Sequence, residues 1–262
     1  MKIVVCIKQV PSTTDAKIDP ETKRIIREGT KAVMNPFDLY AVEEAVRIKE
    51  QLGGEVTALS MGPESAKMSL IEALSMGSDK AVLLCDRAFA GSDTWATSYA
   101  LAKAIEKIGG VDLVICGKQA VDGDTAQVGP GIAAKLDIIQ SANVSKVEEV
   151  SDDVITVSRM NETGSDLLKL RLPALITVIK DINEPRIPTL KNARKARNTE
   201  IPIWRPDDIG AEADKIGLNA SPTRVVKTEP PATRNTVTKK IEGDAESAAE
   251  ALLNELVSRK LI

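Results

Sequence analysis

A segment of glycines and small polar residues, residues 117–130, carries the strongest chemical signal in the sequence. It reads GKQAVDGDTAQVGP and directly follows the apolar run VDLVIC. Gly117 and Gly123 let the backbone approach a ligand without interference from a Cβ atom. Backbone N–H groups at the start of a helix suit a phosphate, and Thr125 and Gln127 add neutral hydrogen-bonding groups. The pattern favours a nucleotide site; the alternative is a capped strand-to-helix loop that binds nothing.

Two carboxylates in this segment, Asp122 and Asp124, oppose an anion by their charge. We therefore expect them to cap a helix that starts at about Asp124, or to accept hydrogen bonds from ribose or ribityl hydroxyls. The chain has neither a GxGxxG nor a GxxxxGK[ST] motif. A standard dinucleotide fingerprint and a P-loop are thus both unsupported, and a nucleotide would need another α/β variant.

The composition excludes several other chemistries. Histidine is absent, which removes Ser-His-Asp and Cys-His triads, His-ligated zinc and imidazole acid–base catalysis. Cys6, Cys85 and Cys116 are far apart, and we expect reduced, buried thiols and no metal site. A net charge of −3 and only two each of Trp, Tyr and Phe argue against nucleic acid. No apolar run approaches the about 20 residues of a membrane span, and we expect a cytoplasmic protein.

Strands and helices alternate four times over roughly the first 130 residues, the pattern of a doubly wound, mostly parallel sheet. The expected strands are residues 2–7, 55–61, 80–84 and 111–116, and helices start after Asn35-Pro36, Gly62-Pro63, Ser92-Asp93 and from about Asp124. In such sheets ligands bind at the carboxyl ends of the strands. The segments after these strands, CIKQV from Cys6, MGP from Met61 and CDR from Cys85, could therefore line one crevice with 117–130 and with NPFD, 35–38.

The second half of the chain changes character. Four strand-like runs, 144–150, 154–159, 167–172 and 175–179, lie close together, and we expect antiparallel pairing that extends the same sheet. A proline-rich, basic stretch from Asn183 to Pro206 predicts an irregular surface segment. Its apolar Leu190 inside a rim of cations is typical of protein recognition; the alternative is a solvated basic loop.

The C-terminal part predicts a separate arm. Residues 219–243 are rich in Ser, Thr, Pro and Lys and cannot bury much apolar surface. A capped amphipathic helix follows at 244–261. We therefore divide the chain into an α/β domain, 1–218, and an arm, 219–262, that docks elsewhere; the alternative is a helix that packs back on its own domain.

Several blocks in a fixed order make the sequence resemble the β subunit of electron-transfer flavoproteins over nearly its whole length. They are VCIKQV from Val5, MNPFD from Met34 with AVEEA from Ala41, MGP from Met61, GKQAVD from Gly117, and LPALIT from Leu172 with NEPR from Asn183. The resemblance implies the Rossmann-like, adenine-nucleotide-binding type of fold and a heterodimer with an α subunit that holds FAD. The β subunit of that family holds a second nucleotide, AMP in simple members and FAD in electron-bifurcating members.

The resemblance also implies two sets of site residues. The family's nucleotide contacts match Cys6, Asn35, Pro36, Phe37, Asp38, Met61, Gly117, Lys118, Gln119, Ala120, Val121, Asp122, Gly123, Asp124, Thr125, Ala126, Gln127 and Val128. The family's recognition loop, within residues 183–198 here, docks dehydrogenases through a leucine anchor. It matches Arg186, Ile187, Pro188, Thr189, Leu190, Lys191, Asn192, Ala193, Arg194 and Lys195, with Leu190 as the anchor.

The branch of the family is read from two stretches. Residues 122–130, with small side chains, and residues 86–95 look like the bifurcating branch, whereas NEPRIPTLKNARKAR keeps the form of simpler members. The bifurcating branch implies FAD in the β subunit, NADH as electron donor, and ferredoxin or flavodoxin as one acceptor. The other electron would pass through the α subunit to an acyl-CoA dehydrogenase or a quinone oxidoreductase. The alternatives are a β subunit that holds a structural AMP, a non-redox module that senses adenine nucleotides, and an ATP-dependent ligase of related fold.

Overall fold

The computed structural model describes residues 1–12, 17–18, 25–26, 32–226 and 238–262. They belong to two compact units, Met1–Lys227 and Thr228–Ile262. Part of the expected linker, 227–237, lies outside the described residues. Among the described residues, no helix is both long and apolar enough to cross a membrane.

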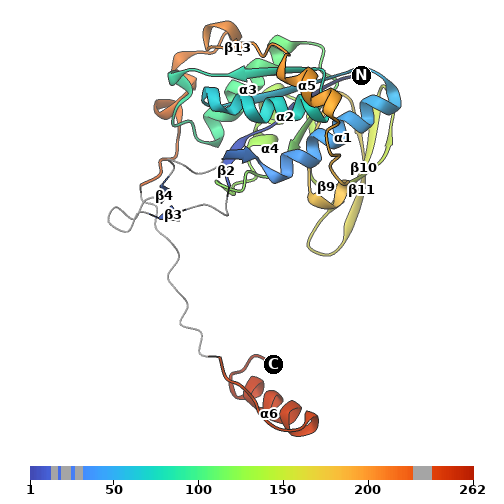
Figure 1. Ribbon diagram of the computed structural model, residues 1–262, viewed down its shortest axis with the longest axis vertical. Helices are drawn as coiled ribbons and strands as arrows, with labels where there is room; N and C mark the ends of the chain where they lie inside the picture. The colour runs from blue at the N-terminus through green and yellow to red at the C-terminus, as the bar shows by residue number, and fades with distance from the viewer. Residues whose placement is uncertain (13–16, 19–24, 27–31, 227–237) are drawn as a thin grey trace. The chain divides into compact units, whose positions relative to one another are not determined.

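A nine-stranded sheet forms the centre of the larger unit, in the order β11-β10-β9-β12-β8-β1-β6-β7-β13 (Figure 1). The strands are β1 (Lys2–Cys6), β6 (Glu55–Met61), β7 (Lys80–Leu84), β8 (Leu113–Gly117), β9 (Ile139–Val150), β10 (Val154–Met160), β11 (Ser165–Arg171), β12 (Ala174–Val178) and β13 (Ile203–Trp204). Two small antiparallel pairs join β2 (Gln9–Pro11) to β5 (Ala32–Met34) and β3 (Lys17–Ile18) to β4 (Ile25–Ile26). The expected doubly wound, mostly parallel fold with an antiparallel extension is confirmed.

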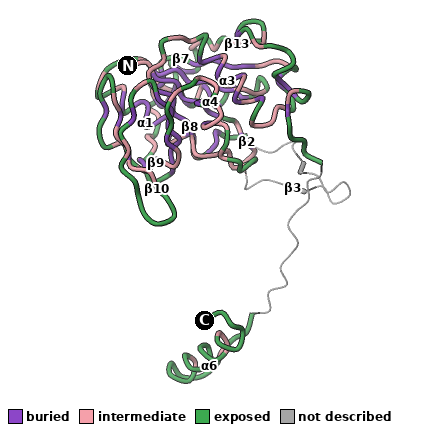
Figure 2. The backbone as a smooth tube through the Cα atoms, turned by 180° about the vertical axis from the view of Figure 1, so that it is seen from behind, coloured by how far each residue is buried: buried purple, intermediate pink, exposed green. Residues whose placement is uncertain are grey.

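Two pairs of helices cover the two faces of the sheet. α1 (Pro36–Leu52) and α2 (Lys67–Met76) pack with Ile3 and Val5 of β1 in one core cluster. α3 (Thr94–Ile108) and α4 (Val128–Leu136) pack with Val4 and Cys6 in the other. Because successive side chains of a strand point to opposite faces, β1 serves both clusters, and the central strands are buried on both sides (purple in Figure 2).

Local signals placed most of these elements correctly. β6 and β7 have the predicted bounds, and α1 begins directly after Asn35. Asp93 caps α3, because its side chain accepts hydrogen bonds from the N–H groups of Trp95 and Ala96. Short 3₁₀ helices at Glu64–Ala66, Arg87–Phe89, Lys180–Ile182, Asp207–Ile209, Ala213–Lys215 and Leu218–Ala220 complete the connections.

Two expectations about the second half are wrong. β9, β10 and β11 pair antiparallel as predicted, but β12 runs parallel between β8 and β9. All five residues of β12 are buried, as is typical of a parallel strand covered on both faces. The segment 183–206 is not irregular throughout, because α5 (Leu190–Arg197) and β13 lie within it. Thr189 caps α5 by accepting a hydrogen bond from the N–H of Asn192.

The smaller unit contains the predicted amphipathic helix, α6 (Ala245–Ser258). Asp244 caps it by accepting a hydrogen bond from the N–H of Ser247, and none of the helix residues is buried. Leu252, Leu253 and Val257 are each about half exposed. Within this unit, no described residue buries these apolar side chains.

Candidate functional site

A cavity of about 340 Å³ opens at the carboxyl ends of β1 and β8. Within the sheet, β6 lies beside β1 on one edge and β8 lies beside it on the other, so the strand order reverses at β1. This reversal is the switch point at which doubly wound sheets bind their ligands. The lining residues are Cys6, Ile7, Lys8, Asn35, Asp38, Met61, Ser92, Asp93, Thr94, Thr97, Leu101, Cys116, Gly117, Lys118, Gln119, Ala120, Gly123, Thr125, Ala126, Gln127, Val128 and Gly129.

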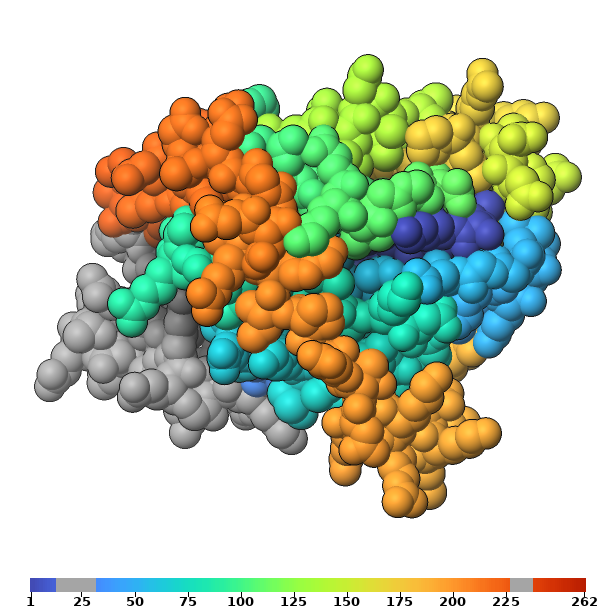
Figure 3. Space-filling view, turned by 90° about the horizontal axis from the view of Figure 1, so that it is seen from above, coloured from blue at the N-terminus to red at the C-terminus, as the bar shows by residue number. Residues whose placement is uncertain are grey.

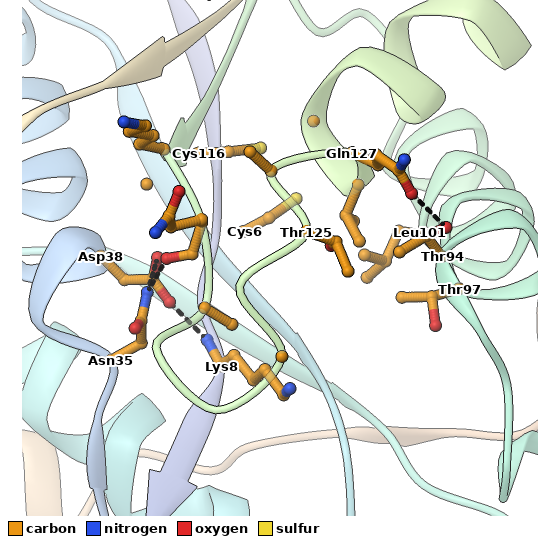
Figure 4. A pocket seen from close by; sticks show the side chains of 18 of the residues that line it. Cys6, Lys8, Asn35, Asp38, Thr94, Thr97, Leu101, Cys116, Thr125 and Gln127 are labelled. Atoms are coloured by element: carbon orange, nitrogen blue, oxygen red, sulfur yellow. Dashed lines mark hydrogen bonds between the residues drawn. The ribbon is translucent and has the colours of Figure 1, made fainter. Parts of the chain in front are cut away.

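One wall is held together by Asn35 and Asp38, shown at the left of Figure 4. Asp38 accepts hydrogen bonds from the backbone N–H of Lys8 at 2.7 Å and from Asn35 Nδ2 at 2.9 Å. Asn35 Nδ2 also donates to the carbonyl of Gln119 at 2.8 Å, and Asn35 Oδ1 accepts from the N–H of Val121 at 3.1 Å. Asn35 therefore shapes the 117–127 loop, whatever else it contacts.

The two loop carboxylates have partners within the chain. Asp122 forms an ion pair with Lys8 Nζ at 2.7 Å, and Asp124 accepts a hydrogen bond from Gln119 Nε2. Neither caps α4, which begins at Val128 after Gln127 without a side-chain cap. The helix starts four residues later than predicted because Asp124 and Ala126 adopt the left-handed conformation, each with φ of 54°. The capping expectation is wrong, and acceptance from a ribose or ribityl hydroxyl stays a prediction.

The two glycines of the loop differ in what surrounds them. A Cβ atom at Gly117 would lie 2.3 Å from Asp38 Oδ1 and 2.8 Å from Phe37, so this glycine lets the start of α1 approach β8. A Cβ atom at Gly123 would meet no atom of the described chain within 4 Å. Space for a side chain is therefore open at Gly123 and closed at Gly117.

The opposite wall is the first part of α3, which the sequence analysis missed. Thr94, Thr97 and Leu101 lie at helical spacing on one face and line the cavity. Thr94 Oγ1 donates to Gln127 Oε1 at 3.1 Å and so joins this wall to the loop (Figure 4). The sequence could have indicated this wall. A helix that follows a strand of a parallel sheet starts at the edge where ligands bind, so the first residues of α3 were candidates.

The match to the predicted cofactor-binding residues is otherwise uneven. The structure brings Cys6, Asn35, Asp38, Met61, Gly117 to Ala120, Gly123 and Thr125 to Val128 to the cavity, but not Pro36, Phe37, Val121, Asp122 or Asp124. Ile7, Lys8 and Gly129 also line it, as expected for the segments that contain them, and Ser92, Asp93 and Cys116 line it without having been predicted. In the part of the chain that the structure describes, no three His, Cys, Asp or Glu side chains come together as metal ligands.

Two cysteines lie side by side in the wall of the cavity. Cys6 of β1 and Cys116 of β8 are register partners and both are buried, whereas Cys85 is half-buried. A hydrogen bond with Cys6 and burial raise the pKa of the Cys116 thiol well above its usual range. Cys116 is therefore a neutral, apolar part of the wall near neutral pH.

Burial controls the charge of Asp38. It raises the pKa of this carboxyl from an ordinary 3.8 to about 7, against the lowering effect of the hydrogen bonds from Asn35 and Lys8. Because the folded chain holds this proton more tightly than the unfolded chain, the proton stabilises the fold fully below about pH 4. This stabilisation is lost as the pH rises through about 7.

The titration of Asp38 gives a first prediction. In Asp38→Asn this proton linkage is absent, so the wild type should lose stability relative to the variant between pH 5 and 7. The expected slope of the difference is up to about 1.4 kcal/mol per pH unit. Urea unfolding of both proteins across this range measures it. Parallel curves would mean that Asp38 titrates like an exposed carboxyl.

The predicted recognition segment lies away from the cavity. It projects from the surface as part of the orange segment at the lower right of Figure 3, and Ile187 and Leu190 are 90% and 92% exposed. Arg186, at its base, instead forms ion pairs with Glu43 and Glu50 of α1. The segment therefore offers apolar side chains to solvent on a base that is fixed to the domain.

The fold and the site together define a class: a doubly wound α/β protein with a ligand cavity at the switch point of its sheet. Residues 22–209 match the family described as "Electron transfer flavoprotein domain". The chain belongs to the electron transfer flavoprotein family, and its relatives identify it with the β subunits.

Three relatives illustrate the match. The chain is 48% identical over 263 residues to "Electron transfer flavoprotein subunit beta" of Thermoanaerobacterium thermosaccharolyticum, covering all of both chains. It is 45% identical to "Protein FixA" of Azorhizobium caulinodans, over 99% of this chain and 95% of the relative. It is 46% identical to "Caffeyl-CoA reductase-Etf complex subunit CarD" of Acetobacterium woodii, over 88% and 89%. Electron transfer is thus the function of this chain at the level of its family.

Proposed function

We propose that this chain is the β subunit of an electron-bifurcating flavoprotein that pairs with an α subunit and holds FAD in the cavity. The observation that carries the proposal is the extent of this cavity. It runs from the 117–129 segment to the polar wall of Thr94 and Thr97 on α3, so it offers more than a phosphate-binding loop. The relative from A. woodii, named as part of a complex with a caffeyl-CoA reductase, supports a partner that acts on a CoA thioester.

The donors and the free space fit a dinucleotide. The N–H groups at the start of α4 suit its phosphates, Gly123 leaves the loop open on the ligand side, and Thr94, Thr97 and Thr125 can hydrogen-bond to hydroxyls. Met61 and Leu101 supply apolar surface that keeps water from the ligand. FAD when bound supplies one- and two-electron transfer, whereas the protein supplies binding, orientation and electrostatics.

The proposed partners follow from this function. NADH is the electron donor, ferredoxin or flavodoxin is one acceptor, and an acyl-CoA dehydrogenase or quinone oxidoreductase is the other. We assign no catalytic side chain to this chain, and the heterodimer works in the cytoplasm. The second candidate is a simple β subunit with a structural AMP in the same cavity, favoured by the recognition segment NEPRIPTLKNARKAR.

The nucleotide content of the heterodimer decides between these two candidates. We expect two FAD per heterodimer and no AMP, because the loop carries small residues and α3 extends the cavity. Acid extraction followed by chromatography counts both nucleotides. An AMP peak equal to the FAD peak would contradict bifurcation but keep the family function, and a heterodimer without flavin would favour a non-redox nucleotide sensor.

The exposed segment around α5 is the proposed docking site for the dehydrogenase. Leu190 is the apolar anchor, and Lys191, Arg194 and Lys195 steer an acidic partner without adding much affinity. Prolines at 185 and 188 restrict the backbone before the anchor and lower the entropy lost on docking.

Leu190→Ala should slow electron transfer to the dehydrogenase without changing the flavin content. Burial of the leucine in a partner pocket contributes about 2 kcal/mol, so docking should weaken roughly tenfold or more. Turnover measured over a range of dehydrogenase concentrations gives the half-saturating concentration. A value equal to the wild type would remove the segment from the docking site.

A further inference from the structure

Arg186 is bound on both sides by carboxylates of α1. Its Nε and Nη2 donate to Glu43 at 2.7 and 3.1 Å, and its Nη1 and Nη2 donate to Glu50 at 2.7 and 2.9 Å. Its backbone N–H also donates to Glu43 Oε2 at 3.1 Å. Two forked guanidinium–carboxylate pairs on one side chain combine strength with a fixed geometry. The backbone directly before Ile187 is therefore tied to α1.

Asn183, three residues before Arg186, is also hydrogen-bonded to α1. Asn183 Nδ2 donates to the carbonyl of Tyr40 at 3.0 Å and to Glu44 Oε2 at 2.9 Å. Residues 40, 43, 44 and 50 lie at spacings of three, four and seven, which places them along one face of α1. Asn183 and Arg186 thus attach the entry of the exposed segment along nearly three turns of one helix.

The far end of the segment is held by packing. Ala196, in the last turn of α5, is 2% exposed and belongs to the core cluster formed with α1 and α2. Between these two ends a cavity of about 250 Å³ lies against α5, lined by Lys49, Arg186 and Lys195 among others. Packing of α5 against α2 therefore holds the far end of the segment, whereas the polar contacts of Asn183 and Arg186 hold its entry.

The charge and burial of the Arg186–Glu43 ion pair argue against a direct contact between Arg186 and the partner. The Glu43 side chain is 7% exposed, and Arg186 is the cation that compensates it. The ion pair also lowers the pKa of Glu50, through the hydrogen bond from Arg186. A partner that captured the guanidinium would have to leave a buried carboxylate without its cation, which is costly.

We propose that Arg186, held by Glu43 and Glu50, is a positioning residue that presents Ile187 and Leu190 to the partner dehydrogenase. This inference rests on the proposed docking function of the segment. It assigns Arg186 a different role from the direct partner contact that the resemblance implies. The energetic consequence is entropic, because a segment ordered before docking loses less freedom when it docks.

A double-mutant cycle tests the assignment. Arg186→Met keeps an unbranched apolar stem but removes the guanidinium and its donors, and Glu43→Gln removes the charge on the other side. In the heterodimer, each change should raise the half-saturating dehydrogenase concentration roughly three- to tenfold, the factor for ordering a few rotamer-rich side chains. Turnover at saturation should stay unchanged, and the double variant should be no worse than the worse single variant.

Two other results would overturn the assignment. If Arg186→Met weakens docking while Glu43→Gln does not, Arg186 contacts the partner directly. If neither variant changes half-saturation and only the melting temperature falls, the pair is a structural ion pair. Hydrogen exchange without the dehydrogenase adds a direct readout: the amides of Ile187 and of residues 189–195 should exchange faster in both variants, and unchanged exchange would contradict positioning.

Matched controls separate this inference from the docking proposal. Arg159→Met and Asp166→Asn remove an arginine–carboxylate pair on the β10–β11 hairpin, 3.4 Å long, and should leave half-saturation unchanged. Leu190→Ala is the reference for docking itself. If Leu190→Ala has no effect, the docking function fails; if it weakens docking while Arg186→Met and Glu43→Gln do not, only the positioning role fails.

Discussion

Gly123→Leu should empty the nucleotide site of this chain while the fold and the flavin of the α subunit remain. Gly123 lines the cavity, and a Cβ atom at this position meets no described atom within 4 Å, so we expect the added side chain to compete with the ligand and not to disturb the core. Overpacking of this kind costs about 1–3 kcal/mol or more, so the ligand should bind at least roughly tenfold more weakly. Nucleotide content after gel filtration, together with the melting temperature, measures both parts of the expectation.

A graded series makes this prediction specific. Gly123→Ala adds only the Cβ atom and should retain most of the nucleotide, because that atom has free space around it. Thr125→Val keeps the shape of the side chain but removes a hydroxyl, and a lost hydrogen bond to a charged partner costs about 1.5–3 kcal/mol. Equal loss of the flavins of both subunits in these variants would indicate general misfolding, and full retention in Gly123→Leu would place the ligand elsewhere.

Deletion of residues 236–262 should break the heterodimer more than it harms the fold of this chain. The helix α6 belongs to a separate compact unit and has no buried residue. Leu252, Leu253, Val257 and Leu261 are each about half exposed or more. Burial of the exposed surface of these four side chains against an α subunit contributes on the order of 3–6 kcal/mol to binding. Without the arm, the affinity for the α subunit should therefore fall about a hundredfold or more.

The test of the arm needs a variant that keeps the chain length. Leu252→Lys with Leu253→Lys preserves the capped helix but places charge on its apolar face, and it should weaken assembly nearly as much as the deletion. Titration of the α subunit, followed by analytical ultracentrifugation, gives the dissociation constants. A truncated chain that binds the α subunit with full affinity would show that the arm packs on its own domain or is dispensable.

The elements with strong local signals were predictable from the sequence. β6 and β7 follow from short apolar runs between turn residues, and α3 follows from its cap, Asp93. α1 begins at Pro36 as expected, but the Asn35 side chain makes no capping hydrogen bond. These signals act between residues a few positions apart, so no knowledge of the tertiary structure was needed. The family followed in the same way, because blocks such as NPFD and GKQAVD keep their order and spacing along the chain.

The details of the site depended on contacts between distant residues. Asn35 forms hydrogen bonds to residues 84 and 86 positions away and so shapes the loop, a role that the sequence did not predict. Asp124 and Ala126 delay α4 through left-handed backbone conformations that hydrophobic periodicity does not reveal. Thr94 and Thr97 became cavity residues because α3 packs beside α4, on the same face of the sheet.

The difference between what the sequence predicts and what the tertiary structure decides is clearest at Arg186. The sequence by itself determined the α/β fold, the family, the loop at residues 117–130 and an apolar residue exposed in a basic segment. The tertiary structure alone decided that Arg186 faces Glu43, 143 residues earlier, instead of solvent. The physical reason is that periodicity and capping are short-range effects, whereas a buried carboxylate selects its cation from whatever the folded chain brings within hydrogen-bonding distance.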